Sequence, residues 1–268
     1  MTPQTFTRFV SCFQICRYMK SNPNDLKPFG KYLEGISRPH GRAKVFDDFL
    51  QIIVCCLSMG RKEELYFKTI KPYSREELEL FSQAFASLIV QMDRKPLEDP
   101  FGDYFEEFLS NSSNGQFFTP SPVAELMAQL TTVRQVGEKR KDGDARVCDP
   151  CCGSGRLLLA AAQQDRKQFF VGTDISYTCC LMTIINLCLN SLNGEVIHMN
   201  TLSDRCWHRW CIIVDSVTKI PTVYEVEEEK INQPPTCADE LKPMPVMGLV
   251  QPVKNITPVN FIRFSPKK

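Results

Sequence analysis

Residues 147–157 read VCDPCCGSGRL, and this stretch decides the fold. A short apolar run ends on an aspartate, a glycine-containing turn follows, and a helical pattern begins near Arg156. A second apolar run, FFVGT at residues 169–173, ends on Asp174, nineteen residues after Gly155. The order strand, glycine turn, helix and strand predicts the first βαβ unit of a nucleotide-binding type of sheet.

The glycine turn predicts a ligand that approaches the backbone closely. Gly153 and Gly155 omit side chains at this point, and the following helix directs its amide dipole toward a bound group. Asp174, at the end of the second strand, is placed to accept hydrogen bonds from ribose hydroxyls. The spacing differs from the dinucleotide pattern G-x-G-x-x-G, because a single G-S-G directly follows D-P-C-C. The pattern therefore favours an adenosine-bearing molecule other than NAD.

Three further segments accompany the glycine turn in a fixed order. They are G-Q-F-F-T-P at residues 115–120, G-T-D-I-S at 172–176, and N-L at 186–187 followed by H-M-N-T-L at 198–202. Together with D-P-C-C-G-S-G at 149–155, they resemble the motifs of adenine-N6 DNA methyltransferases. The resemblance is closest to the methylation subunits of type I restriction-modification systems.

The resemblance implies an α/β fold with the Rossmann-like, doubly wound sheet of S-adenosylmethionine-dependent methyltransferases, an N-terminal helical domain and a shortened C-terminal half. It also implies the cofactor S-adenosyl-L-methionine. Asp149 and the backbone of residues 153–155 would lie near its methionine moiety, Asp174 at its ribose, and Ile175 and Asn200 beside its adenine. The cofactor-binding residues implied in this way are Phe118, Thr119, Pro120, Asp149, Gly153, Ser154, Gly155, Asp174, Ile175 and Asn200.

The catalytic motif of that family, N-P-P followed by Phe or Tyr, does not occur in this sequence. In the family it ends the strand after the N-x-L segment, where it holds the target amine and stacks on a flipped base. The corresponding strand here is predicted at residues 210–214 and continues into Asp215. Asp215 is the one candidate for a catalytic role, although the alternative that it merely ends a strand is favoured. The nearest similar string, N-Q-P-P-T at 232–236, is interpreted as a loop.

The resemblance and the missing motif leave more than one function open. The leading hypothesis is a DNA adenine-N6 methyltransferase-like protein of restriction-modification or mobile-element type, with DNA and a specificity or other subunit as partners. The alternative is a non-catalytic, degenerate methyltransferase fold that acts as a cofactor-binding or scaffold subunit. A third hypothesis is methylation of RNA or protein. The missing motif favours the alternative, whereas the retained cofactor motifs favour the leading hypothesis.

Composition indicates an intracellular globular protein. The 268 residues are 43% hydrophobic, which is enough for a substantial core. Thirteen cysteines would suggest disulfides in a secreted protein, but the N-terminus lacks a signal pattern, and the longest apolar run, residues 52–57, is too short to span a bilayer. We therefore expect a reduced, cytoplasmic protein. The C-x-x-C spacing at 148–151 has no clean second pair, so no metal site is expected.

Three regions are predicted along the chain. Residues 1–110 read as an N-terminal helical domain, 111–220 as the methyltransferase-like cofactor-binding core, and 221–268 as a shortened sheet end with a proline-rich tail. The net charge of +1 gives no overall case for nucleic acid, but residues 1–44 contain eight Lys or Arg and two acidic residues. This basic segment suits either a phosphate backbone or a solvated helical surface. Ser74 is predicted to cap a helix that continues through residues 78–89.

Overall fold

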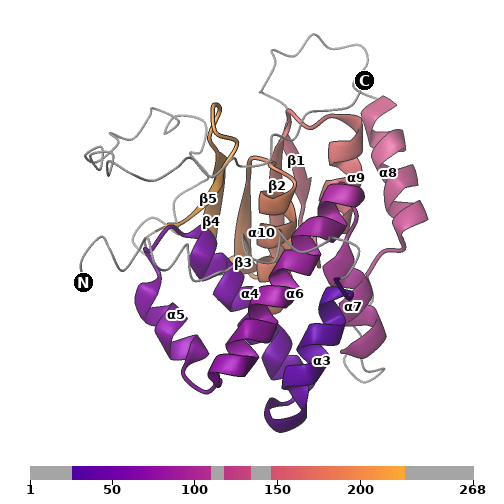
Figure 1. The fold of residues 1–268 in the computed structure, drawn as a ribbon. Helices are drawn as coiled ribbons and strands as arrows, with labels where there is room; N and C mark the ends of the chain where they lie inside the picture. Colours follow the sequence, from indigo (N-terminus) through magenta and orange to yellow (C-terminus); the bar gives the residue numbers. More distant parts are fainter. Residues whose placement is uncertain (1–25, 110–117, 134–145, 227–268) are drawn as a thin grey trace. The chain divides into compact units, whose positions relative to one another are not determined.

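The computed structural model describes residues 26–109, 118–133 and 146–226. In this part of the chain, helices precede a five-stranded sheet and also connect its first strands (Figure 1). The helices are α3 (Phe29–His40), α4 (Arg42–Leu57), α5 (Glu63–Ile70), α6 (Arg75–Arg94), α7 (Pro100–Phe108), α8 (Ser121–Val133), α9 (Arg156–Gln164) and α10 (Tyr177–Leu189). The strands are β1 (Arg146–Asp149), β2 (Phe169–Asp174), β3 (Gly194–Asn200), β4 (Arg205–Val214) and β5 (Pro221–Glu225).

The helices form where the sequence has apolar stripes and capping residues. On α4, Phe46, Phe49 and Ile53 recur at three- and four-residue spacings and are fully buried. The predicted cap of α6 is confirmed as a reciprocal capping box. The Ser74 hydroxyl accepts from the Glu77 N–H, and the Glu77 carboxylate accepts from the Ser74 N–H.

Helix α10 is the centre of the hydrophobic core. Ten consecutive residues, Cys179 to Cys188, are buried, because α10 lies between the sheet and α4. The cysteines among them are free and pack as small apolar side chains. The described helices and strands belong to one compact unit. No helix in the described ranges is both long enough and apolar enough to cross a lipid bilayer.

The first three strands form the predicted βαβ arrangement. Strand β1 pairs in parallel with β2, and β2 in parallel with β3, with α9 and α10 as the crossover helices. Parallel strands end at the same edge of a sheet. We call this the carboxyl edge, where Asp149, Asp174 and Asn200 are the last residues of their strands.

The second half of the sheet differs from the prediction. The fold is α/β, but the described strands follow the order β1-β2-β3-β4-β5, without the reversal of a doubly wound sheet. Strand β4 runs antiparallel to β3, since only residues 201–204 join them and a parallel strand would need a longer crossover. Arg205 therefore lies opposite Asn200 at the carboxyl edge, and Ile212 lies opposite Gly194 near the other edge.

Some predictions fall on residues outside the described ranges. These include the G-Q-F part of the segment at residues 115–117, the N-Q-P-P-T string at 232–236 and the proline-rich tail beyond 226. They stay predictions from the sequence.

Candidate functional site

Hydrogen bonds tie the ends of the three parallel strands together at the carboxyl edge. The hydroxyls of Thr173 and Thr201 both donate to the Pro150 carbonyl, at 2.8 and 2.9 Å. The Cys152 N–H donates to the Thr173 carbonyl at 2.9 Å. The glycine turn after β1 is therefore held against the residues that follow β2 and β3. The sequence motifs that lie far apart in the chain meet here.

Asp174 shapes the glycine turn as well as ending β2. One carboxylate oxygen accepts from the Gly153 N–H and the other from the Ser176 N–H, both at 2.8 Å. Sequence reasoning assigned Asp174 to a ribose alone. Because each carboxylate oxygen can accept more than one hydrogen bond, Asp174 retains acceptor capacity for a ligand.

Asp149 carries an unsatisfied acceptor at the same edge. Its Oδ1 accepts from the Cys151 N–H at 3.1 Å, whereas its buried Oδ2 has no hydrogen-bond partner in the described part of the chain. Burial raises the pKa of this carboxyl, the Cys151 N–H lowers it, and the negative charge of Asp174 raises it further. An acceptor buried without a donor is costly. A bound cationic donor would give Asp149 Oδ2 a hydrogen-bond partner and so remove the free-energy cost of burying it unpaired.

The two glycines of the turn have protein neighbours, which corrects part of the prediction. Both have positive φ, 55° at Gly153 and 87° at Gly155, so L side chains would be strained there. A Cβ on Gly153 would lie 2.8 Å from the Phe118 ring, and one on Gly155 would lie 3.1 Å from the Thr183 side chain. The glycines are thus needed for turn geometry and close packing, rather than only for the approach of a ligand.

The segment containing Phe118 lies across the glycine turn. The Phe118 ring covers Gly153 and packs against Phe105 of α7. The Thr119 carbonyl accepts from the Arg156 guanidinium at 3.1 Å, and the Pro120 carbonyl accepts the first N–H groups of α8. All three residues are therefore placed next to the candidate site.

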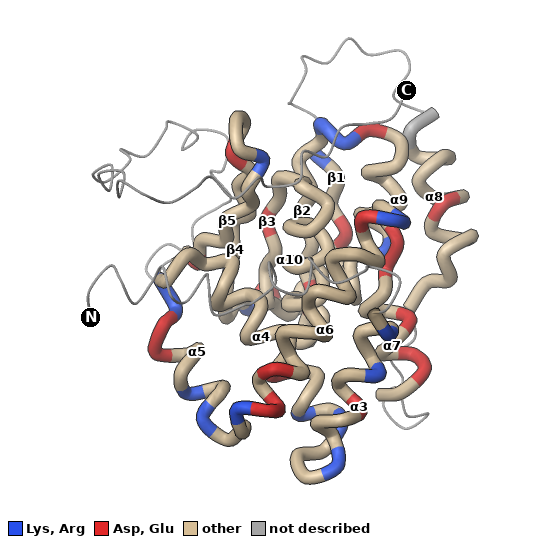
Figure 2. Tube along the Cα trace, viewed as in Figure 1, with Lys and Arg blue, Asp and Glu red and all other residues tan. Residues whose placement is uncertain are grey.

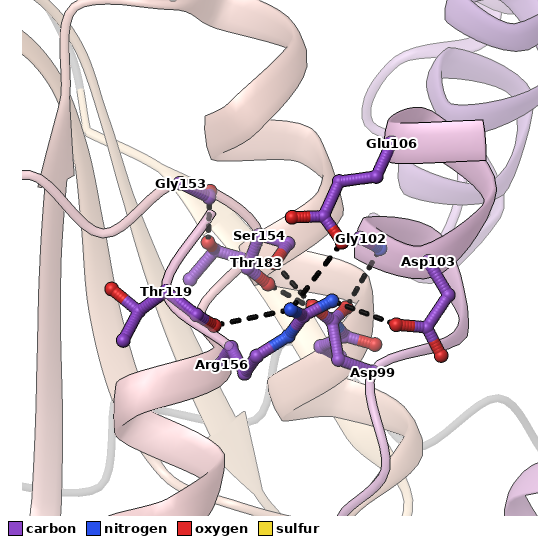
Figure 3. Close-up of polar contacts among 10 residues, drawn as sticks. Asp99, Gly102, Asp103, Glu106, Thr119, Gly153, Ser154, Arg156 and Thr183 are labelled. Carbon is purple, nitrogen blue, oxygen red and sulfur yellow. Dashed lines mark hydrogen bonds and ion pairs between the residues drawn. The ribbon is translucent and has the colours of Figure 1, made fainter. Parts of the chain in front are cut away.

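A buried polar network under the turn centres on Asp99, which sequence reasoning missed (Figure 3). The Asp99 side chain is 3% exposed and accepts four hydrogen bonds. The donors are the Ser154 hydroxyl, Arg156 Nε at 2.9 Å, the Gly102 N–H at 3.0 Å and Asn186 Nδ2 at 2.9 Å. One carboxylate thus joins α7, the glycine turn, α9 and α10.

Arg156 completes this network from the first position of α9. Its side chain is 8% exposed, and besides Asp99 it pairs with Asp103 at 2.8 Å and Glu106 at 3.6 Å, both on α7. The sequence signals for the network were the D-P pair at residues 99–100, typical of a helix start, and an arginine directly after G-S-G. Neither signal indicates that the two side chains meet.

Of the remaining predicted binding residues, Ser154 is buried, whereas Ile175 and Asn200 lie at the carboxyl edge. Ser154 is fully buried and its hydroxyl donates to Asp99, so its side chain is not available to a ligand. Ile175 is 59% exposed just after β2. Asn200 ends β3, where its Oδ1 accepts from the N–H groups of Leu202 and Ser203. Ile175 and Asn200 are thus at the carboxyl edge; their place beside an adenine stays a prediction.

Asp215, the only residue predicted as a catalytic candidate, lies at the edge of the sheet opposite the candidate site. It follows the last residue of β4, and this antiparallel strand ends at the edge opposite the glycine turn (Figure 1). Its carboxylate accepts from the N–H groups of Thr218 and Val217 and from the Thr218 hydroxyl, and these bonds lower its pKa. Asp215 therefore caps an exposed turn, in agreement with the favoured alternative of a strand end.

Comparisons with known proteins agree with these motifs. The family model described as N-6 DNA Methylase matches residues 97–233, just over half of the chain. The chain is 27% identical to the "Type I restriction enzyme MpnII methylase subunit" of Mycoplasma pneumoniae, covering 62% of this chain and 34% of that protein. It is 33% identical to the "Type II methyltransferase M.MamI" of Microbacterium ammoniaphilum, covering 34% of this chain and 30% of that protein.

A solved structure is also similar, the type I restriction-modification system methyltransferase subunit from Streptococcus thermophilus. It shares 23% identity with a TM-score of 0.35, covering 65% of this chain and 39% of that one. The chain spans about a third of the length of the curated relatives it matches.

The buried network predicts a large stability effect at Asp99. Asp99→Ala leaves buried donors on Arg156, Ser154 and Asn186 without their acceptor, so we expect the free energy of unfolding in urea to fall by about 3 kcal/mol. Glu98→Ala is the matched control, because Glu98 pairs only at the surface with Lys95. It should change stability by less than about 0.5 kcal/mol. Equal stability of the two variants would contradict the assigned role of Asp99.

Proposed function

The chain belongs to the N-6 DNA methylase family, and from this premise we propose that the carboxyl edge of its sheet binds S-adenosyl-L-methionine. The observation that carries the proposal is the buried, unpartnered Oδ2 of Asp149. An ammonium group is the kind of donor that satisfies such an oxygen, and the methionine moiety of this cofactor carries one. Asp174 adds a second negative charge near Asp149, which favours a cationic ligand.

The other residues of the carboxyl edge also fit this cofactor. Asp174 is available to accept from ribose hydroxyls, and the exposed Ile175 offers an apolar surface to an adenine ring beside Asn200. Phe118, packed over Gly153, shields the turn from water. When bound, S-adenosyl-L-methionine supplies a methyl group on a positively charged sulfur.

We further propose that this chain supplies the cofactor half of a DNA adenine-N6 methyltransferase of restriction-modification or mobile-element type. Transfer to an adenine amine needs the base to be extruded and aligned with the methyl group. The sequence lacks N-P-P-aromatic, and the antiparallel direction of β4 takes Asp215 to the opposite edge. Both observations support the view that acceptor alignment comes from a partner subunit, and that the chain alone is non-catalytic.

DNA is the proposed macromolecular partner. The described part of the basic segment 1–44 lies on α3 and the start of α4, where Lys31, Arg38 and Arg42 line an open hollow together with Glu34. Acidic residues are interspersed with Lys and Arg along the trace (Figure 2). A contact with phosphates at this hollow would therefore be weak and would decrease steeply with salt.

The raised pKa of Asp149 predicts a pH-dependent affinity for the cofactor. A raised pKa means that the free protein retains this proton to higher pH than an ordinary carboxyl. An ammonium group binds the ionised form, so calorimetric affinity for S-adenosylmethionine should increase as the pH rises through this pKa and decrease below it. Asp149→Asn should weaken binding about tenfold or more and flatten this dependence.

Asp165→Asn is the control for that titration, because Asp165 lies at the exposed end of α9, where its carboxylate accepts from the backbone N–H of Lys167. It should reproduce the affinity and pH dependence of the unsubstituted protein. If the unsubstituted protein shows no binding at millimolar ligand, the cofactor assignment is wrong.

The missing acceptor groups predict that the purified chain does not methylate DNA by itself. Tritiated methyl transfer from S-adenosylmethionine to mixed DNA should stay at background under conditions where calorimetry detects cofactor binding. The physical reason is that the sequence lacks the N-P-P-aromatic groups that would hydrogen-bond to the extruded base and stack on it. Robust, sequence-specific adenine methylation by the chain alone would overturn the non-catalytic assignment.

A further inference from the structure

A group of rings that the proposed function does not use borders the carboxyl edge. This ring cluster consists of Tyr177 at the start of α10, His198 on β3, and Trp207, His208 and Trp210 on β4. The His198 ring lies 4.8 Å from Trp207 and 5.5 Å from His208, the latter nearly parallel. His208 stacks in turn on Trp210 at 5.4 Å.

The register of β3 and β4 brings Trp207 to this edge. Met199 lies opposite Cys206, and His198 lies opposite His208, so Trp207 is the extra residue of a bulge. Bulges commonly redirect a side chain at the rim of a sheet. His198 links the bulge to the candidate site, because its Nε2 is 3.1 Å from the Ile175 carbonyl. The His198 ring therefore lies between Trp207 and the loop that carries Ile175.

The ring cluster runs from the core to the surface. Trp210 is 3% exposed, and hydrophobic packing accounts for it. Trp207, in contrast, is only half-buried, and the exposed Arg205 places its guanidinium 5.6 Å from the indole centroid. Ile175 and Leu202 are also exposed next to the same strand ends. A half-buried indole, a cation and two exposed apolar side chains thus lie near the carboxyl ends of β2 and β3 and the start of β4.

We propose that Trp207, with His198 behind it, forms a stacking wall for the adenine ring of the cofactor. The inference rests on the proposed function, because it names a subsite for the same ligand. Aromatic side chains stack on bases through their π faces, and an arginine beside the ring adds a cation–π contribution. The Arg205 guanidinium lies over the Trp207 ring, so an adenine stacks beside this guanidinium or displaces it. Neither the stacking nor the cation–π contact depends on the hydrogen-bonding pattern of the base.

The order of groups along the sheet indicates that Trp207 faces the adenine of the cofactor, and not the adenine of an acceptor base. Asp149 ends β1, Asp174 ends β2, and the ring cluster lies on β3 and β4. A cofactor with its ammonium at Asp149 and its ribose at Asp174 extends its adenine toward Trp207. The reacting methyl group would then be separated from the ring cluster by the ribose. An acceptor base has to reach the methyl group, so Trp207 is assigned to the adenine of the cofactor.

The chain offers a direct optical test, because Trp207 and Trp210 are its only two tryptophans. Trp210→Phe leaves Trp207 as the sole reporter, and Trp207→Phe leaves Trp210. Each protein is titrated with S-adenosylhomocysteine, adenosine and methionine, with excitation where adenine does not absorb. We expect the two adenine-containing ligands to quench the unsubstituted protein and Trp210→Phe. Quenching should be lost in Trp207→Phe, and methionine should quench none of them.

Calorimetry on the same proteins separates this inference from the proposed function. Trp207→Ala should weaken S-adenosylhomocysteine binding about tenfold or more, whereas Trp207→Phe keeps a ring and retains most of the affinity. Binding that is unaffected by Trp207→Ala, or equal quenching in Trp207→Phe, would overturn the stacking wall and leave the cofactor site standing. No binding by the unsubstituted protein would overturn both. Quenching by an oligomer of deoxyadenosine but not by S-adenosylhomocysteine would overturn the assignment to the cofactor.

Discussion

The ion pair between Asp99 and Arg156 is the interaction on which the candidate site depends. It joins α7 to the start of α9 across 57 positions of sequence, and both side chains are almost completely buried. A buried ion pair stabilises a fold only when its remaining hydrogen-bonding groups are satisfied. Here Ser154, Gly102 and Asn186 satisfy Asp99, while Thr119 and two acids of α7 satisfy Arg156. The Asp99–Arg156 pair consequently fixes the glycine turn to α7 and α10. Asp149 and Asp174 do not take part in this network.

The sequence predicts the part of the site that depends on local pattern. Asp149, the glycine turn and Asp174 follow from strand, turn and helix signals within thirty residues, and the structure brings them to one edge. The Asp99 network could not be predicted, because a pairing between distant charged residues leaves no periodic signal. The antiparallel direction of β4 was also not predicted, since a doubly wound sheet is mostly parallel. The short connection of residues 201–204 was the available clue, because only an antiparallel strand can follow such a turn.

The strand order bears on where an acceptor base would be aligned. In doubly wound sheets, a ligand binds where the strand order reverses beside the first strand. Among the described strands, β1 has a partner on one side only, and the strands beyond β3 continue away from it. The described residues thus include no strand on the other side of β1. This absence among the described strands is consistent with the proposal that a partner subunit supplies the groups that align an acceptor base.

A crystal structure of the chain with S-adenosylhomocysteine tests the central claim most directly. The account predicts that the ligand lies along the carboxyl edge of the sheet, with its ammonium at Asp149, its ribose at Asp174 and its adenine between Ile175 and Trp207. It also predicts that the Asp99–Arg156 pair is unchanged, because the turn is already in its binding geometry. A ligand bound elsewhere, or bound in the reverse direction with adenine at Asp149, would contradict the account.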